Sequence, residues 1–261
     1  MIALETRSLN KSFGSLAVTQ EVSLAFEAGL RYAIIGPNGA GKTTYFNLLA
    51  GNLHPDSGAI VFEGRNVTGL DVASRARIGI ARSFQRNNVF PDFSVRDNLA
   101  LACALQAGST PIFWRPMRRL TSAHAEADEI ATRVGLNELL DSSARNINYG
   151  SQRQLEVALA LACKPKVLLL DEPTSGMSPD ETARMHELIT ALPRSLTVIV
   201  IEHDMDIVLD FADRIIVLDY GRVLEQGTPT DIRASKVVRE RYLGEHAFAG
   251  DAGHPPGGRA S

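Results

Sequence analysis

The sequence is short of cysteine and has no large excess of either charge. Only two cysteines occur among 261 residues, Cys103 and Cys163, each in an apolar stretch. A disulfide-stapled secreted domain is therefore not expected, and a reducing cytosol fits better. The 27 basic and 30 acidic residues nearly cancel. Composition thus provides no strong field that would recruit nucleic acid, and we expect no nucleic-acid partner.

Long apolar runs are also missing. A membrane-spanning helix needs roughly 20 consecutive apolar residues, and runs such as Val167–Leu170 and Val198–Ile201 are far shorter. Residues Met1–Arg7 lack the basic-then-apolar layout of a signal peptide. If the protein works at a membrane, we expect another chain to span it. The 44% of hydrophobic residues still allow a sizeable core, in one large domain or in a core with a sub-domain.

Four short apolar runs, separated by helical patterns, predict an α/β fold with a mainly parallel sheet. They are Tyr32–Ile35, Val167–Leu170, Val198–Ile201 and Ile215–Leu218. Continuous apolar runs of this kind are typical of strands covered on both faces. Ligands of such sheets bind beyond the carboxyl ends of the strands. Here those ends are followed by a glycine-rich loop, a pair of carboxylates, a Glu-His pair and an aspartate.

Other segments have different patterns. Leu9–Phe26 and Gly58–Val67 alternate apolar and polar residues, which predicts a small antiparallel sheet at the edge of the core. Residues from about 91 to 162 are mainly helical in pattern, including an amphipathic stretch over Thr121–Leu136. We interpret them as a helical sub-domain inserted into the α/β core. The Gly/Pro-rich tail, 247–261, is expected to be disordered.

The glycine-rich loop Gly36–Thr43 matches G-x-x-x-x-G-K-[ST] between a predicted strand and a predicted helix starting near Lys42. Glycines let backbone N–H groups turn toward phosphate, and a helix N-terminus adds a favourable dipole. Lys42 would reach the β- and γ-phosphates, and the Thr43 hydroxyl would coordinate Mg²⁺. The alternative, a chance glycine turn, is disfavoured by the correct placement of strand and helix.

Four polar residues could complete a nucleotide site. Asp171 follows the most apolar run, where P-loop ATPases place an aspartate that supports Mg²⁺. Glu172 could polarise the attacking water as a general base. Without the phosphate loop, this pair could equally cap the turn before Pro173. Gln85 could ligate Mg²⁺ or position water, and His203 could donate a hydrogen bond to a γ-phosphate, although each in isolation fits an ordinary polar residue.

The order of these motifs resembles ABC transporter ATPase subunits, and in finer grain the LivG-type subunits of branched-chain amino-acid importers. Besides the phosphate loop, Gln85, Asp171-Glu172 and His203, the resemblance rests on four stretches. These are Arg82–Gln85, Ile147–Glu156, Ile201–Met205 and Tyr242–Glu245. It covers about Leu4 to Gly244 and implies a P-loop NTPase (RecA-like) core within an ATPase domain over residues 1–246.

The resemblance implies a role for each matching residue. Phe13 would stack on adenine, Thr43 and Gln85 would ligate Mg²⁺, and Asp171 would support the metal. Glu172 would be the catalytic base and His203 the γ-phosphate switch. Ser175–Asp180 would cross the interface of an ATPase dimer, homo- or heteromeric, in which each signature segment completes the partner's ATP site. The implied nucleotide-binding residues are Phe13, Gly36, Pro37, Asn38, Gly39, Ala40, Gly41, Lys42, Thr43, Thr44, Asn148, Gly150 and Ser151.

The signature segment departs from the family pattern. Leu-Ser-Tyr-Gly-Gln is replaced by Ile147–Ser151, so that Asn148 stands for the phosphate-binding serine and Ser151 for the glutamine. Asparagine is still a good N-cap with an NH₂ donor. A helix beginning near Gly150 would present N–H groups to a phosphate. Ser178 also replaces the usual Asp or Asn. Because Asn148 and Ser151 would complete the partner's ATP site, we hypothesise unequal ATP sites in a heterodimer.

Several functions remain open at this point. The resemblance implies a peripheral ATPase on the cytoplasmic face of the plasma membrane, working with permease subunits and, indirectly, a solute-binding protein. Its solute would be a branched-chain or related amino acid, or another small polar solute such as an amide, urea or an aromatic acid. A non-transport ABC ATPase, a P-loop kinase or GTPase, and a binding-only subunit are the rivals. Pro111–Arg119, aromatic and basic, would contact a membrane subunit, lipid or the helical sub-domain.

Overall fold

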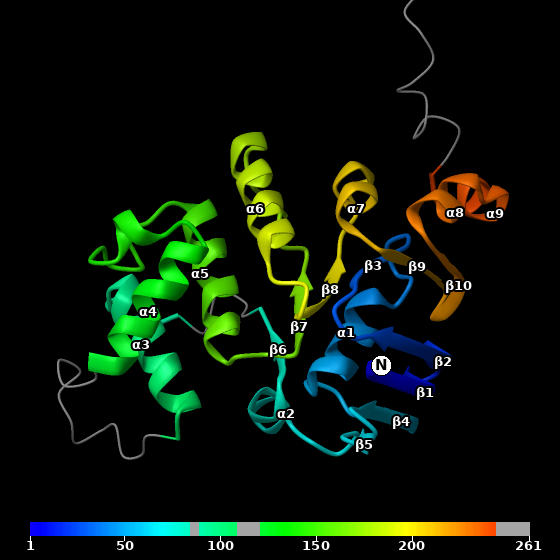
Figure 1. The fold of residues 1–261 in the computed structure, drawn as a ribbon. Coiled ribbons are helices and arrows are strands. Elements are labelled where there is room, and N and C mark those ends of the chain that lie inside the picture. Colours follow the sequence, from blue (N-terminus) through cyan, green and yellow to red (C-terminus); the bar gives the residue numbers. More distant parts are fainter. Residues whose placement is uncertain (84–88, 109–120, 244–261) are drawn as a thin grey trace, which may run out of the picture.

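A six-stranded, mainly parallel sheet forms the centre of the molecule (Figure 1). The computed structural model describes residues 1–83, 89–108 and 121–243. β3 pairs in parallel with both β8 and β9, β7 joins β8 to β6 in parallel, and β10 adds antiparallel to β9. The strands, in sheet order, are β10 (Arg222–Gly227), β9 (Arg214–Asp219), β3 (Arg31–Ile35), β8 (Thr197–Ile201), β7 (Val167–Asp171) and β6 (Ile80–Arg82).

Both faces of this sheet are buried, which explains why its strands appear in the sequence as continuous apolar runs. In β7, Val167 and Leu169 belong to one hydrophobic cluster, whereas Leu168 and Leu170 belong to the other. Successive side chains of a strand point to opposite faces, so both sets must be apolar when both faces are covered. The expected α/β fold with a mainly parallel sheet is confirmed. β6 and β10, which are less uniformly apolar, were not predicted.

A second, antiparallel sheet lies at the edge of the core, as expected. β1 begins at Ile2, however, and not at Leu9 as the alternation predicted. Its pairing with β2 shifts register between Thr6 and Leu9, and Ser8 has a positive φ of 42°. Such a bulge interrupts the period of two that reveals a strand in the sequence. The sheet order is β2 (Leu16–Glu27), β1 (Ile2–Phe13), β4 (Ser57–Phe62) and β5 (Arg65–Asn66).

Helices cover the parallel sheet on both faces. Buried residues of α1 share one cluster with the antiparallel sheet and with one face of the parallel sheet, so α1 lies between the two sheets. In Figure 1, α6 and α7 lie on the other side of the parallel sheet. The helices outside the predicted helical region are α1 (Lys42–Ala50), α2 (Val72–Ile78), α6 (Pro179–Ala191), α7 (Met205–Phe211), α8 (Pro229–Ala234) and α9 (Lys236–Val238), the last followed by a π-helical turn over Arg239–Leu243.

The predicted helical region contains three α-helices and one short 3₁₀ turn in its described part. Ile130 and Val134, four residues apart in the predicted amphipathic stretch, are both buried. Residues Pro111–Arg119 lie outside the described residues, as does the tail 247–261, and the division of the chain at residue 246 stays a prediction. The elements are α3 (Val95–Gln106), α4 (Thr121–Arg133), the 3₁₀ turn Asn137–Leu139 and α5 (Tyr149–Ala162).

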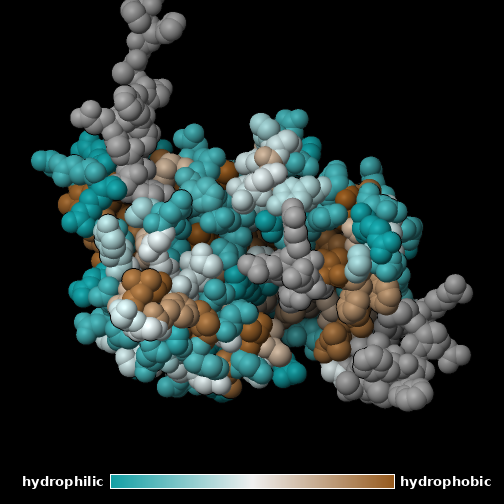
Figure 2. All heavy atoms as spheres, turned by 180° about the vertical axis from the view of Figure 1, so that it is seen from behind, coloured by the Kyte–Doolittle hydropathy of each residue, from teal (hydrophilic) through white to brown (hydrophobic). Residues whose placement is uncertain are grey.

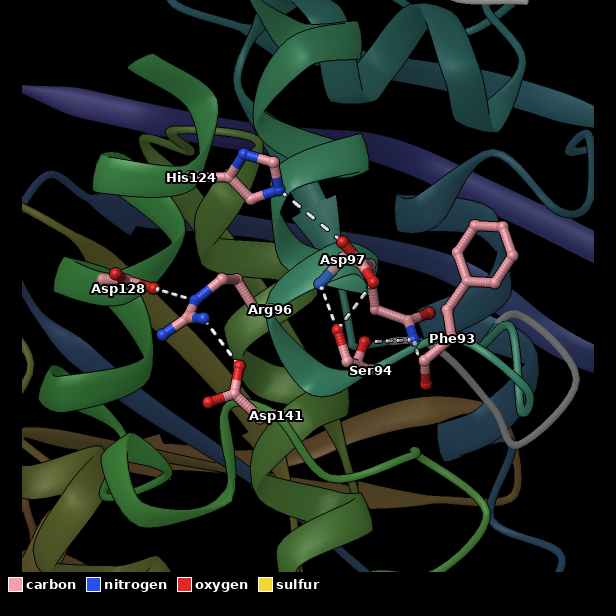
Figure 3. Close-up of polar contacts among 8 residues, drawn as sticks. Phe93, Ser94, Arg96, Asp97, His124, Asp128 and Asp141 are labelled. Atoms are coloured by element: carbon pink, nitrogen blue, oxygen red, sulfur yellow. Dashed lines mark hydrogen bonds and ion pairs between the residues drawn. The ribbon is translucent and has the colours of Figure 1, made fainter. Parts of the chain in front are cut away.

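Ion pairs tie α3 to its neighbours in this region (Figure 3). Arg96 lies between two carboxylates, with Nε 2.8 Å from Asp128 and Nη1 2.6 Å from Asp141. On the same helix, Asp97 lies 3.6 Å from the His124 ring. These partners come from α4 and from the segment between α4 and α5. The exposed pairs contribute orientation more than stability, because surface ion pairs are worth roughly 0–1 kcal/mol each.

In the view of Figure 2, the surface has no large apolar patch. Hydrophilic residues predominate there, and the apolar ones lie in small separate groups. Within the described residues, no helix combines the length and the hydrophobicity needed to cross a bilayer.

Arg75 of α2 is the largest fully buried side chain among the described residues. Its guanidinium donates to the backbone carbonyls of Leu48 and Leu49 at 2.5 and 2.6 Å, and to those of Leu70 and Thr68 at 3.1 Å each. Burial lowers the pKa of Arg75 to about 10. The side chain therefore satisfies carbonyls at the C-terminal end of α1, where that of Leu48 otherwise accepts, among the described residues, only from the backbone N–H of the C-cap Gly51 at 3.3 Å.

Replacing this arginine tests its structural role. We expect Arg75→Met to destabilise the fold by about 2–4 kcal/mol, since it leaves several buried carbonyls without a donor. Urea unfolding followed by circular dichroism measures the change. Arg77→Met, an exposed arginine on the same helix, is the matched control and should stay within about 0.5 kcal/mol. Equal effects of the two substitutions would contradict the role given to Arg75.

Candidate functional site

The loop Gly36–Thr43 joins the carboxyl end of β3 to the first turn of α1. Two of its glycines are required by backbone geometry. Gly36 has a φ of 151°, and a Cβ there would lie 2.2 Å from the carbonyl oxygen of Leu218; Gly41 has a φ of 94°, and a Cβ would lie 2.4 Å from that of Val18. The loop is thus pressed against the neighbouring backbone, with Asn38 and Gly39 exposed at its tip. This strand–loop–helix arrangement is suited to cradling phosphate.

Lys42 lies at the start of α1 with its ammonium group folded onto the loop. Its Nζ donates to the carbonyl oxygens of Gly36 and Pro37 at 2.7 and 3.0 Å, and the residue is only 8% exposed. Burial lowers the pKa of Lys42, while the nearby carboxylates of Glu172 and Asp171 act in the opposite direction. The structure therefore places Lys42 close enough to the predicted carboxylate pair for their charges to affect its pKa.

Asp171, the last residue of β7, and Glu172, which follows it, have different surroundings. Asp171 is largely buried and accepts a 2.6 Å hydrogen bond from Arg82. Burial raises the pKa of Asp171, against the opposing effect of this arginine. Glu172 is more exposed and has a positive φ of 46°. That region is strained for a residue other than glycine, and such strain clusters at functional sites.

His203 faces the second carboxylate. Its Nδ1 lies 3.6 Å from Oε1 of Glu172, and the His203 side chain is 54% exposed. The two residues follow β7 and β8, which are neighbours in the parallel sheet. Because parallel strands end at the same edge, side chains far apart in sequence meet there. A carboxylate and an imidazole at this distance can share a water molecule, with the carboxylate as a hydrogen-bond acceptor, and the imidazole can donate to a phosphate oxygen.

Glu202 holds this pair in place, a role that sequence reasoning did not assign. It is 2% exposed, and its Oε1 accepts from the backbone N–H and the hydroxyl of Thr174 at 3.2 and 2.5 Å. The other oxygen, Oε2, accepts from the backbone N–H of His203 at 3.2 Å. Three donors thus satisfy one buried carboxylate. Glu202 fixes the segment after Glu172 relative to the segment that begins at His203.

The residues present fit a magnesium ion bound together with a nucleotide. Among the described residues, no group of three or more His, Cys, Asp or Glu could hold a metal by itself. Mg²⁺ is commonly held by only one or two protein oxygens, together with substrate phosphates and waters. Thr43, exposed in the first turn of α1, and Asp171 offer a hydroxyl and a carboxylate of this kind. Gln85, the third predicted ligand, lies outside the described residues.

Phe13 lies at the end of β1 and is 49% exposed, so its ring is accessible to a planar ligand. Lys11 places its ammonium 5.9 Å from the centre of this ring. Stacking on adenine stays a prediction. The remaining predicted loop residue, Thr44, is half-buried in the first turn of α1.

The segment Ile147–Ser151 begins α5, in the helical region. Asn148 is the N-cap, and its Oδ1 accepts from the backbone N–H of Ser151 at 2.8 Å. The backbone N–H of Gly150 donates to Oε1 of Glu181 at 3.1 Å. Two N–H groups at this helix terminus are thus used within the chain. The sequence indicated the cap, but not the carboxylate of Glu181.

The predicted interface loop packs against this segment. The Tyr149 hydroxyl donates to the carbonyl oxygen of Ser175 at 2.9 Å and accepts from Nε of Arg153 at 3.1 Å. Ser178 is the N-cap of α6 in a capping box with Glu181. The serine that departs from the family pattern is therefore a satisfactory helix cap. Through Glu181 and Tyr149, the signature segment and this loop are linked directly.

A family profile described as ABC transporter matches residues 19–175. The chain belongs to the ABC transporter family. This cassette is 39% identical over 256 residues to the high-affinity branched-chain amino acid transport ATP-binding protein LivG of Salmonella typhimurium, covering 93% of the chain and 98% of the relative. It is 38% identical over 252 residues to BraF of Pseudomonas aeruginosa, a protein of the same description, with the same shares covered.

A solved ATP-binding cassette of an ABC transporter, in its ADP conformation, superimposes with a TM-score of 0.83 at 29% identity. The superposition covers 94% of this chain and all of the solved one. The expected family and the P-loop ATPase fold are confirmed, and the chain is an ABC ATPase subunit. The individual roles predicted for its residues stay predictions, supported by the placements described above.

Glu202→Gln tests the buried carboxylate. The amide group would place an NH₂ donor against a backbone N–H, so we expect a loss of about 1–3 kcal/mol in stability and reduced ATP turnover. Urea unfolding and a coupled phosphate-release assay measure the two effects. Glu187→Gln, on an exposed position of α6, serves as the control. The positioning role is wrong if Glu202→Gln behaves like that control in both assays.

Proposed function

We propose that this cassette is the ATP-hydrolysing subunit of an importer for branched-chain or related amino acids. The observation that carries the proposal is its similarity, nearly end to end, to LivG and BraF. ATP would bind with its phosphates in the Gly36–Thr43 loop and its adenine against Phe13. Lys42 would exchange its two carbonyl acceptors for phosphate oxygens, which are stronger acceptors for an ammonium group.

The carboxylate and histidine after β7 and β8 support a hydrolytic step. Glu172 would accept a proton from water as the water oxygen bonds to the γ-phosphorus. The bond between that phosphorus and the bridging oxygen breaks, and ADP leaves with the electron pair. His203 would donate a hydrogen bond to the γ-phosphate. Mg²⁺, when bound, neutralises charge on the β- and γ-phosphates.

The second half of the site would come from another ATPase subunit. Asn148, Gly150 and Ser151 lie on α5 in the helical region, and the hydrogen bonds of Asn148 and Gly150 lead to Ser151 and Glu181. A partner's γ-phosphate at this terminus would be favoured by the helix dipole. ATP can close such a dimer because its γ-phosphate makes contacts that ADP lacks, so hydrolysis reopens it.

Membrane subunits would contact the cassette beside α2 and α3. A cleft of about 340 Å³ lies there, lined by residues that include Ala76, Phe90, Leu101 and Leu105. Phe90 and Leu105 are 50% and 59% exposed. Exposed apolar side chains around a cleft favour a protein partner. The subunit would then sit on the cytoplasmic face of the plasma membrane, with a solute-binding protein acting on the other side.

The hydrolytic role is tested with Glu172→Gln in the complex with co-purified partners. We expect a loss of turnover of about 10²–10⁴-fold and an ATP-trapped dimer in size-exclusion chromatography. Lys42→Ala combined with Glu172→Gln should abolish the trapping, because the phosphates lose their lysine. In a heterodimer, we expect the loss of turnover from Glu172→Gln to exceed the loss from the same substitution in the partner subunit. The partner's ATP site would be completed by Asn148 and Ser151 of this chain. Equal losses would contradict unequal sites, and normal turnover would contradict the role of Glu172.

The transported solute is tested by reconstituting the complex in liposomes with its solute-binding protein. We expect leucine, isoleucine or valine to stimulate ATP turnover. Stimulation only by urea, an amide or an aromatic acid would instead indicate an importer of another small polar solute. A complex that hydrolyses ATP but does not assemble with membrane subunits would instead indicate a non-transport ABC ATPase.

A further inference from the structure

Arg82, the last residue of β6, joins three parts of the fold through one guanidinium group. Its side chain is only 11% exposed. One amino group, Nη2, lies 2.6 Å from Oδ2 of Asp171, while Nη1 donates to Asn47 and Asn52 at 2.5 and 3.2 Å. The guanidinium also lies 5.6 Å from the centre of the Phe46 ring. The group is held from several sides and cannot turn freely.

Asp171 is held in turn by this arginine. Within the described residues, its Oδ2 is bonded to Arg82 and its Oδ1 makes no hydrogen bond. β6 and β7 pair in parallel, with Arg82 opposite Leu169. The carboxylate therefore has one anchored oxygen and one oxygen left for another partner. A group that orients a metal-binding carboxylate in this way commonly affects metal affinity or activity by about 10–100-fold.

We propose that Arg82 is a positioning residue for the metal site, and that it sets the affinity for the divalent cation bound with the nucleotide by fixing the Asp171 carboxylate. The inference rests on the proposed function, since it takes Asp171 as the residue that supports the metal. In this proposal Arg82 contacts neither the nucleotide nor the metal. It acts through Asp171, and it ties that carboxylate to α1 through Asn47 and to the segment after α1 through Asn52.

Two effects of the guanidinium on metal binding have opposite signs. Its orientation of Asp171 favours the metal, whereas its positive charge repels a divalent cation. Removal of the side chain therefore weakens metal binding if positioning dominates and tightens it if charge repulsion dominates. A purely structural tie between β6 and α1 would change stability and leave metal affinity unchanged. The direction of the change separates these three roles.

The surroundings of Arg82 also permit a chemical rescue. Arg82, Ser83 and Asn52 line a surface cleft of about 380 Å³, together with residues of α2. A truncated side chain at position 82 would leave space next to this cleft, through which a small cation could reach Asp171. Guanidinium ion has the planar fork of the lost side chain, whereas urea has a similar shape and no charge.

The experiment measures binding of Mn²⁺ to the full chain in the presence of ADP, from the electron paramagnetic resonance signal of free Mn²⁺. We expect Arg82→Ala to weaken Mn²⁺ binding about tenfold and Arg82→Lys to weaken it less, with metal-free ADP binding unchanged. Millimolar guanidinium, far below denaturing concentrations, should restore the affinity of Arg82→Ala, and urea should not. Arg194→Ala is the control, because Arg194 makes an ion pair of the same 2.6 Å length with Asp213 outside the site.

Unchanged or tighter Mn²⁺ binding in Arg82→Ala would overturn the inference. If that variant does not fold, Arg82→Lys and Arg82→Met carry the same test, and wild-type affinity in both would overturn it equally. Failure of the wild-type chain to bind Mn²⁺ with ADP would instead count against the proposed function. Normal wild-type binding with unaltered variants would leave the ATPase role intact and remove only the role of Arg82.

Discussion

The parallel alignment of β3, β8 and β7 determines where the phosphate loop, the carboxylate pair and His203 lie. β3 pairs with β8, and β8 with β7, all in one direction. Their carboxyl ends therefore bring the phosphate loop, His203 and the Asp171-Glu172 pair to one edge of the sheet. That alignment is maintained by apolar side chains on both faces, which belong to two separate cores. The hydrophobic effect, which grows with the apolar area that these strands bury, is the main force that assembles the site.

Much of the fold and site could be predicted because the relevant signals are local. A run such as Val198–Ile201 is itself a strand signal, and the spacing from Gly36 to Thr43 contains both the turn and the start of the helix. Asn148 as an N-cap is equally local. The first part of β1 was missed because the register shift near Ser8 breaks its alternation. Short strands such as β6 carry too few residues to show a period.

The residues that sequence reasoning missed make contacts between distant parts of the chain. Arg82 meets Asp171 only because β6 and β7 are neighbours in the sheet. Glu202 is an ordinary glutamate in the sequence, and two of its hydrogen bonds depend on the turn that brings Thr174 within reach of its side chain. Glu181 meets Gly150 because α6 packs near the start of α5. In each case the partner is chosen by tertiary packing, which a single sequence does not display.

The hydrogen bonds from Arg75 to the C-terminal end of α1 also affect the dipole of this helix. A helix carries roughly half a positive charge at its N-terminus and half a negative charge at its C-terminus. In α1 the negative end is matched permanently by the buried guanidinium, which contacts the carbonyls of Leu48 and Leu49. The positive end faces the phosphate loop. The C-terminal end of this helix dipole is thus compensated in the folded chain. Under the proposed function, only its N-terminal end would change its charge environment when a nucleotide binds or leaves.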